Sequence, residues 1–263
     1  MDKQPYHVVS WSGGKDSTAT IILAHELGLP IDLIIISIPF FDKERGIYAE
    51  RSDVIDWIKN TAKPIFESWG YPVKIVSSDK DYLYYFWKIR EKSEKHPEHI
   101  GKYYGFLIGG ACVFQQEKVR PIKQYLAPFK RRYEIKEYVG ICFDEPKRLD
   151  RVHNRKDQIS LLEQQKKTQN DAKMKCAEYG LLSPTYTEGR KRGGCWFCPN
   201  QSIAELAALK QTDPGKWNEL EVLSREKNTV SRGFKYGVPF EEINEKVDVY
   251  IENQQRQISL FKI

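Results

Sequence analysis

Six residues near the N-terminus constrain the fold of this chain more than any other feature of its sequence. Residues 12–17 read Ser-Gly-Gly-Lys-Asp-Ser and directly follow a short apolar run, His7–Trp11, which predicts a strand. They also open a segment, Lys15–Leu27, whose pattern predicts a helix that ends at Gly28. A strand that enters a helix through a glycine loop is typical of α/β folds.

The same loop has the chemistry of a phosphate site. Two glycines permit positive φ and close backbone approach, so successive N–H groups can converge on a phosphate. The helix N-terminus adds unpaired N–H groups and a favourable dipole. Lys15 adds a positive charge, and Asp16 can orient the loop or help hold a metal ion. The alternative is an ordinary turn with Ser12 as N-cap; a Walker motif is excluded because it needs a longer loop.

Residues 1–152 alternate strand and helix patterns. The runs Asp32–Ile38, Pro72–Val76 and Tyr138–Phe143 predict further strands, and Glu50–Trp69 predicts a helix closed by Gly70. We therefore expect an α/β domain with a Rossmann-like, doubly wound parallel sheet that binds a nucleotide.

Residues 153–263 have a different pattern of predicted secondary structure. Helices are predicted over Gln158–Tyr179, near Ser202–Gln211 and over Lys216–Lys227, and no strand pattern is evident. We expect this part to be a helical, cysteine-bearing C-terminal appendage.

Composition narrows the class of protein. With 40% hydrophobic and 13% aromatic residues, a disordered chain is excluded. The net charge of +6 suits anionic substrates or nucleic acid.

There is no signal-peptide pattern, and the longest apolar stretch, Ile31–Phe41, is far shorter than the roughly 20 residues that span a bilayer. We expect a soluble, cytoplasmic protein without a membrane partner, in which cysteines serve as thiols or metal ligands.

The cysteine spacing predicts a metal or cluster site. Cys195 and Cys198 form a C-x-x-C motif after Gly193 and Gly194, which suits two thiolate ligands on one tight turn. We assign four ligands, with the remaining cysteine, Cys142, as a core residue in a buried strand. The ligand set is Cys112, Cys176, Cys195 and Cys198. A [4Fe–4S] cluster, structural zinc and a redox dithiol all remain open, since four thiolates accept either metal.

Three landmarks together resemble the N-type ATP pyrophosphatases, the superfamily of adenine nucleotide alpha hydrolases. They are the PP-loop at residues 12–17, the run Tyr138–Leu149, and Leu181–Tyr186 followed by Gly193–Asn200 (Gly-Gly-Cys-Trp-Phe-Cys-Pro-Asn). Within the superfamily the chain is most similar to the phosphoadenosine phosphosulfate reductase-like group. The landmarks extend from residue 8 to about residue 200, so the resemblance covers most of the chain.

The resemblance implies a site and a reaction. The loop would bind the phosphates of ATP or of a sulfonucleotide. Ser37, at the end of the second strand, would contact the adenine. These nucleotide-binding residues are Ser12, Gly13, Gly14, Lys15, Asp16, Ser17 and Ser37. The resemblance also favours a [4Fe–4S] cluster over zinc. It implies adenylyl activation assisted by Mg²⁺, with release of pyrophosphate, followed by sulfur transfer onto tRNA or DNA from the cluster or a separate donor protein.

Two other functions stay open. One is a reductase of phosphoadenosine phosphosulfate or adenylyl sulfate, but such enzymes attack with a cysteine near the C-terminus, and none follows Cys198 here. Cluster-bearing reductases also carry an adjacent Cys-Cys pair, whereas Ala111 precedes Cys112. The other is a non-catalytic, nucleotide- and cluster-dependent module associated with DNA.

Charged residues supply further candidates. Arg148 follows the predicted strand Tyr138–Phe143 and is expected to contact an anion, with Lys147 or Arg151 as substitutes. Asp144 and Glu145 are expected either to hold magnesium or to form a salt-bridged loop. His153, near the end of the first half of the chain, is a weaker candidate for a site residue. Two basic groups either track a nucleic-acid backbone or line a solvated face. They are Arg190–Arg192 and the set Lys118, Arg120, Lys123, Lys130, Arg131, Arg132 and Lys136, with Tyr125, Phe129 and Tyr133 interleaved.

The C-terminal string Gln257–Phe261 (Gln-Ile-Ser-Leu-Phe) resembles the short peptides with which bacterial proteins dock on the replication sliding clamp. An exposed, unstructured terminus would suit such docking. The alternative is a terminal apolar strand packed on the body.

Overall fold

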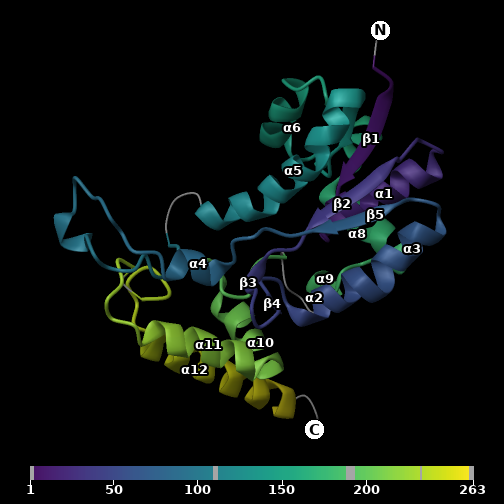
Figure 1. Cartoon of the computed structure of the whole chain (residues 1–263). Helices are drawn as coiled ribbons and strands as arrows, with labels where there is room; N and C mark the ends of the chain where they lie inside the picture. The colour runs from purple at the N-terminus through teal and green to yellow at the C-terminus, as the bar shows by residue number, and fades with distance from the viewer. Residues whose placement is uncertain (1–2, 109–111, 188–192, 232, 261–263) are drawn as a thin grey trace. The chain divides into compact units, whose positions relative to one another are not determined.

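The computed structural model (Figure 1) describes residues 3–108, 112–187, 193–231 and 233–260. The chain divides into two compact units, each assembled from separate stretches of sequence. Unit 1 comprises Met1–Pro39, Glu50–Asp79 and Glu117–Gly193, and unit 2 comprises Phe40–Ala49, Lys80–Gln116 and Gly194–Ile263. The boundary expected between residues 152 and 153 falls inside unit 1.

Unit 1 is built on a five-stranded parallel sheet with the strand order β5-β2-β1-β6-β7. From β1 the chain adds strands on one side and then returns to add strands on the other, which is the winding of a Rossmann-like fold. The expected α/β class with a doubly wound parallel sheet is thereby confirmed. The strands are β1 (Pro5–Ser10), β2 (Leu33–Ser37), β5 (Val73–Val76), β6 (Glu134–Tyr138) and β7 (Gln158–Ile159).

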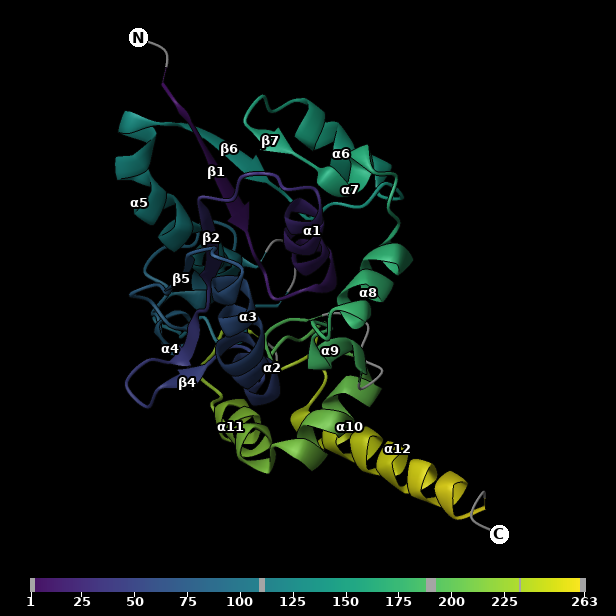
Figure 2. The same cartoon turned by 90° about the vertical axis from the view of Figure 1, so that its right-hand side faces the viewer.

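Helices flank this sheet. Helix α1 (Lys15–Glu26) follows β1 as predicted and packs against α8 (Gln169–Glu178) (Figure 2). The segment predicted as one helix over Glu50–Trp69 is helical from Ser52 to Ser68 but changes its winding. It consists of α2 (Ser52–Trp57), a π-helical turn (Ile58–Ala62) and α3 (Lys63–Ser68). The remaining helices are α5 (Gln116–Arg132), α6 (Pro146–His153), α7 (Leu161–Gln164) and α9 (Pro184–Thr187).

The position predicted for the fourth strand of unit 1 is wrong. The strand predicted at Tyr138–Phe143 ends at Tyr138, and Cys142 therefore lies in the loop after β6. The sequence Glu-Ile-Lys-Glu-Tyr of β6 is too polar to stand out, yet it pairs along its whole length with β1.

The helix predicted over Gln158–Tyr179 is interrupted. The short strand β7 comes first, although no strand was expected here, and Ser160 then caps α7 by accepting a hydrogen bond from the Glu163 N–H. Lys166 has a left-handed φ of 50°, which ends this turn, and a capping box of Thr168 and Asp171 starts α8.

Unit 2 has a small hairpin and mostly helices around an aromatic core. The hairpin joins β3 (Phe40–Asp42) and β4 (Ile47–Tyr48). The helices are α4 (Tyr82–Phe86), α10 (Ile203–Thr212), α11 (Pro214–Ser224) and α12 (Phe240–Leu260), with short 3₁₀ turns at Pro97–His99 and Val113–Gln115. The helices expected near Ser202–Gln211 and Lys216–Lys227 are confirmed by α10 and α11. The core includes Phe41, Tyr82, Phe86, Phe114, Trp196, Phe197 and Phe234.

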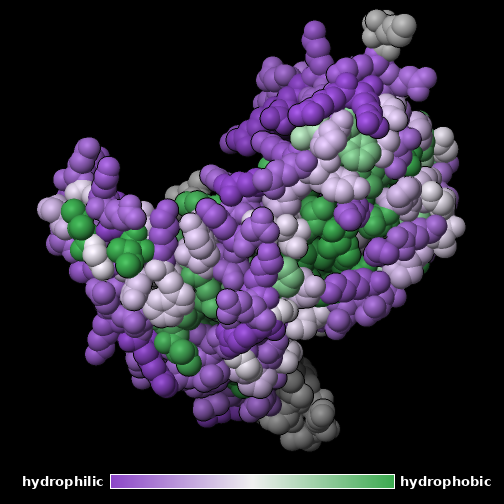
Figure 3. All heavy atoms as spheres, viewed as in Figure 1, coloured by the Kyte–Doolittle hydropathy of each residue, from purple (hydrophilic) through white to green (hydrophobic). Residues whose placement is uncertain are grey.

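The described residues contain no helix that is both long enough and apolar enough to cross a bilayer. On the face drawn in Figure 3, hydrophilic residues cover most of the surface and are interrupted by smaller hydrophobic areas.

Candidate functional site

The glycine loop lies at the point where the strand order of the sheet reverses. Residues 11–14 follow the carboxyl end of β1, whose neighbours are β2 on one side and β6 on the other. Residues 139–145 follow the carboxyl end of β6, at the same edge of the sheet. Open α/β sheets bind their ligands in the crevice at such a switch point.

The loop is shaped by one glycine and two serines. Gly13 has a φ of 73°, which favours glycine, and a Cβ there would lie 3.1 Å from the side chain of Ile58. The Ser12 N–H donates to Ser17 Oγ at 3.1 Å, and the two hydroxyls lie 3.0 Å apart. The N-cap of α1 is Gly14, without a side-chain cap. Ser12 is therefore not the N-cap expected in the alternative; its hydroxyl accepts a hydrogen bond from the Gly14 N–H at 3.3 Å.

Gly140, in the loop after β6, makes the closest approach to this region. A Cβ at Gly140 would lie 2.5 Å from the backbone nitrogen of Ser17 and 2.7 Å from the carbonyl carbon of Asp16. Only glycine therefore lets the second loop pack on the first turn of α1. Sequence analysis missed this role, although an isolated glycine in a strand pattern is a signal of close backbone approach.

Lys15 and Asp16 form an ion pair at the start of α1. Lys15 Nζ lies 2.5 Å from Asp16 Oδ1 and 3.3 Å from Gln169 Oε1 on α8. Burial lowers the pKa of Lys15, but the hydrogen bond and charge of Asp16 outweigh it, so that the pKa is raised above its ordinary value. The ammonium group therefore stays charged at neutral pH.

Asp16 also meets two residues of the loop after β6. The Cys142 thiol donates to Asp16 Oδ1 at 3.2 Å, and the Cys142 N–H donates to Glu145 Oε2 at 3.0 Å. Burial and the Asp16 charge raise the pKa of Cys142, which keeps it a thiol at neutral pH. One ligand atom from each of Asp16, Cys142 and Glu145 lies within 4.8 Å of the others. Two carboxylates so placed suit a hard divalent cation.

The magnesium ligands expected from the sequence are only partly brought together. Glu145 joins Asp16, whereas the Asp144 carboxylate accepts a hydrogen bond from the Gln169 N–H at 3.0 Å, at the start of α8. Arg148 pairs with Glu145 at 2.6 Å, so this segment is also the salt-bridged loop that was the alternative. The anion contact expected of Arg148, whose side chain is 53% exposed, stays a prediction.

Two predicted residues have other partners. Ser37 Oγ, at the end of β2, donates to the Glu117 carbonyl oxygen at 3.2 Å. His153 Nε2 lies 2.8 Å from a Glu163 carboxylate oxygen at an exposed position. A role for Ser37 at the adenine stays a prediction.

Tyr186, which the sequence analysis did not single out as a site residue, lies over the loop. Its hydroxyl accepts a hydrogen bond from the Lys15 N–H at 3.4 Å, and the Lys15 ammonium lies 5.9 Å from its ring centre. Burial raises the pKa of Tyr186, so the phenol is neutral. Cys176, on α8, donates its thiol hydrogen to the Lys15 carbonyl oxygen at 3.2 Å, and burial raises its pKa to about 12.

A Tyr186→Phe variant is expected to bind inorganic pyrophosphate about 2- to 10-fold more tightly than the wild type. The Tyr186 hydroxyl occupies the Lys15 N–H, which a phosphate would otherwise bind, and a net hydrogen bond is worth about 0.5–1.5 kcal/mol. Titration calorimetry with pyrophosphate measures the change. Weaker binding would show instead that the hydroxyl contacts the ligand.

The C-x-x-C turn belongs to unit 2 and is anchored by its two central residues. Trp196 and Phe197 are buried in the aromatic core, and Trp196 Nε1 donates to the Tyr48 carbonyl oxygen at 2.8 Å. The Cys198 N–H donates to the Cys195 carbonyl oxygen at 3.0 Å, which closes the turn. Both cysteines are half-buried.

Cys112 joins this turn around Tyr82. The Tyr82 ring is buried 4.0 Å from the ring of Phe197, and its hydroxyl accepts a long hydrogen bond from the Leu107 N–H at 3.4 Å. Burial raises the pKa of Tyr82, and negative charge on Cys112, Cys195 or Cys198 would raise it further. Cys112 and Cys195 both pack against the aromatic core that contains Tyr82, and Cys198 is in the same turn as Cys195. Cys176 belongs to unit 1, and its place in the ligand set stays a prediction.

The basic segment on α5 resembles the solvated face more than the nucleic-acid track. Its aromatic residues pack against the sheet, with the rings of Tyr6 and Phe129 5.3 Å apart and those of Tyr6 and Tyr133 5.1 Å apart. These rings are half-buried against the sheet, which leaves less of their faces for bases to stack on.

Two further predicted segments fall at the limits of the described residues. Arg190–Arg192 lie outside them. Of Gln257–Phe261, the part up to Leu260 is the end of α12, a helix rather than the unstructured terminus or strand considered from the sequence. Docking on a sliding clamp stays a prediction.

Comparison with known proteins adds one distant relative. No family model matches the chain. An uncharacterized protein of Methanocaldococcus jannaschii is 25% identical over 242 residues, which cover 86% of this chain and 50% of the relative. The chain thus spans about half the length of the curated relative that it matches.

Proposed function

We propose that this protein is a PP-loop enzyme of the adenine nucleotide alpha hydrolase type, similar to the phosphoadenosine phosphosulfate reductase-like group. It would activate an acceptor by adenylylation and couple this step to sulfur transfer onto a nucleic acid, tRNA or DNA. The observation that carries the proposal is the glycine loop, which lies at the switch point of the sheet and leads directly into the N-terminus of α1.

The residues around the loop suit the cleavage of ATP between its α- and β-phosphates. An acceptor oxygen attacks the α-phosphorus, and pyrophosphate leaves with the negative charge that develops on it. The loop N–H groups and the charged Lys15 are suited to stabilise that leaving group. The carboxylates of Asp16 and Glu145 would hold Mg²⁺, which when bound neutralises charge on the phosphates.

The three cysteines of unit 2 are suited to an iron–sulfur cluster. Cys112 and the Cys195–Cys198 turn come from two distant segments that pack against the same aromatic core. The surrounding aromatic core would shield a cluster from water, and the Gly193–Gly194 backbone leaves the turn room to close on it. A [4Fe–4S] cluster bound there would supply a site for sulfur; zinc is the alternative.

Serine variants test this assignment. Replacement of Cys112, Cys195 or Cys198 by serine is expected to remove at least half of the iron from anaerobically purified protein, because a hydroxyl is a poor ligand for the cluster. Elemental analysis and the absorption spectrum measure the loss. Cys142→Ser serves as the matched control and is expected to keep its iron, while Cys176→Ser decides whether Cys176 is the fourth ligand. Zinc in place of iron in the wild type would contradict the cluster.

The proposed reaction is tested by anaerobic turnover of ATP labelled at the α- and γ-phosphates, with tRNA or DNA present. AMP and pyrophosphate that form only with nucleic acid would support adenylyl activation and identify the acceptor. If the α–β bond stays intact, the mechanism is wrong, and reduction of a sulfonucleotide with an external thiol becomes the reaction to test.

A further inference from the structure

A cavity lies within unit 2 and is not part of the glycine-loop site. It has a volume of about 450 Å³, in the range of about 300–1,000 Å³ that small-molecule sites occupy. Its walls combine aromatic side chains, one guanidinium group and a hydroxyl. The lining residues used below are Arg90, Tyr104, Phe106, Leu107, Ser231 and Tyr236.

The cavity is assembled from three chain segments that pair through their backbones. The Arg90 N–H donates to the Lys102 carbonyl oxygen at 2.9 Å, and the Ser231 N–H donates to the Tyr104 carbonyl oxygen at 3.2 Å. Gly105 has a φ of 71°, and a Cβ there would lie 2.2 Å from Ser231 Oγ. The close approach that builds this wall therefore requires a glycine.

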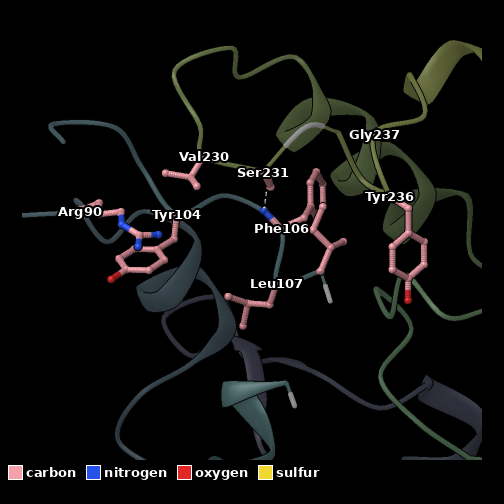
Figure 4. Close-up of a pocket in the computed structure, with 9 residues that line it drawn as sticks. Arg90, Tyr104, Phe106, Leu107, Val230, Ser231, Tyr236 and Gly237 are labelled. Atoms are coloured by element: carbon pink, nitrogen blue, oxygen red, sulfur yellow. Dashed lines mark hydrogen bonds between the residues drawn. The ribbon is translucent and has the colours of Figure 1, made fainter. Parts of the chain in front are cut away.

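Cations gather around one aromatic ring of the cavity. The Arg90 guanidinium lies 5.7 Å from the centre of the Tyr104 ring, and the Lys88 ammonium lies 5.9 Å from it. Figure 4 shows Arg90 and Tyr104 together on one side and Tyr236 on the other, with Phe106 and Leu107 between them. Both cations lie over the Tyr104 ring, so a base that stacks on this ring would take the place of a cation, which could then pair with the phosphate of the nucleotide.

A polar group and a strained residue complete the site. Ser231 Oγ accepts a hydrogen bond from the Phe106 N–H at 2.8 Å, which leaves its hydroxyl proton for a base edge. Tyr236 is 56% exposed and has a φ of 51°, a left-handed conformation that is uncommon for a residue with a side chain and clusters at ligand sites.

The cavity borders the cysteine cluster. Leu107 lines the cavity, and its N–H donates to Tyr82, which belongs to the aromatic core against which Cys112 and Cys195 pack. On the other side, the Tyr236 hydroxyl donates to Asn200, two residues after Cys198. Leu107 and Tyr236 therefore connect the wall of the cavity to the segments that carry the cysteines.

We propose that this cavity receives one nucleotide of a single-stranded nucleic acid, with its base on Tyr104 and its phosphate at Arg90 and Lys88. The proposal rests on the proposed function, because it makes this nucleotide the part of the acceptor that sulfur would reach. Binding by itself requires neither ATP nor iron.

The test uses the full chain, purified with its metal content intact, and a fluorescently labelled single-stranded oligonucleotide of DNA or RNA. Anisotropy gives Kd over a range of salt concentrations. Tyr104→Ala is expected to weaken binding about 5- to 150-fold, because a base loses its stacking partner, while Tyr104→Phe keeps the ring and the affinity. Arg90→Gln is expected to reduce the slope of log Kd against log salt by about 0.7, one phosphate contact.

The control is Arg225→Gln, which removes an exposed arginine paired with Glu221 on α11 and is expected to change neither quantity. The proposal is wrong if the wild type does not bind the oligonucleotide, or if Tyr104→Ala and Arg90→Gln bind like the wild type. Nucleoside monophosphate that competes as well as the oligonucleotide would overturn the assignment to a nucleic acid. Cleavage of ATP is measured separately, so that a failure of the cavity and a failure of the glycine-loop reaction are distinguished.

Discussion

A Lys15→Met variant is expected to cleave ATP between its α- and β-phosphates about 100- to 1,000-fold more slowly than the wild type. Loss of one charged donor from a site that stabilises developing negative charge has an effect of this size. Lys15 is suited to this role because it is largely buried, charged and held by Asp16 at 2.5 Å. The release of labelled pyrophosphate gives the rate.

The ionisation of Lys15 is not expected to make this rate depend on pH near neutrality. The interaction with Asp16 raises the pKa of Lys15 above its ordinary value, so its charge is lost only in strongly alkaline solution. Between pH 7 and pH 9 we therefore expect no decline in the rate that depends on Lys15. A Lys63→Met variant, which removes a surface lysine paired with Glu67, is the matched control and should behave as the wild type. Full activity of Lys15→Met would contradict the assignment of the loop.

A Gly140→Ala variant is expected to lose nucleotide binding and about 1–3 kcal/mol of the free energy of unfolding. The added methyl group would lie 2.5 Å from the Ser17 nitrogen, and the atom it meets is backbone, which cannot rotate away. The loop after β6 or the first turn of α1 must move, and either movement displaces Ser17, Asp16 or Cys142. Calorimetry with ATP and denaturant unfolding measure the two effects.

Gly215→Ala is the control for this change. Gly215 lies in α11, where a Cβ would be 3.6 Å from its nearest neighbour, an ordinary contact, and alanine favours helix over glycine. We expect this variant to be as stable as the wild type or slightly more so. A Gly140→Ala protein that binds ATP with unchanged affinity would show that the contact between the two loops does not shape the site.

Local sequence was sufficient for the elements whose signal lies within a single run of residues. Leu33–Ser37 is almost wholly apolar and β-branched, and it forms a buried central strand because only such a run can face helices on both sides. The glycines at 13 and 28 mark the entry and exit of α1, since each adopts a left-handed φ that other residues avoid. The α/β class and the place of the loop follow from these signals.

Tertiary structure alone decided which distant residues meet. β6 is polar in sequence and is a strand because β1 supplies its hydrogen bonds, so the strand lies at Glu134–Tyr138 and not at the predicted Tyr138–Phe143. Gly140, Tyr186 and Cys142 reach the glycine loop only when the chain has closed around α1. Likewise, Cys112 joins the C-x-x-C turn because the two segments share one aromatic core. Spacing along a sequence records local geometry, whereas these contacts depend on how separate segments pack.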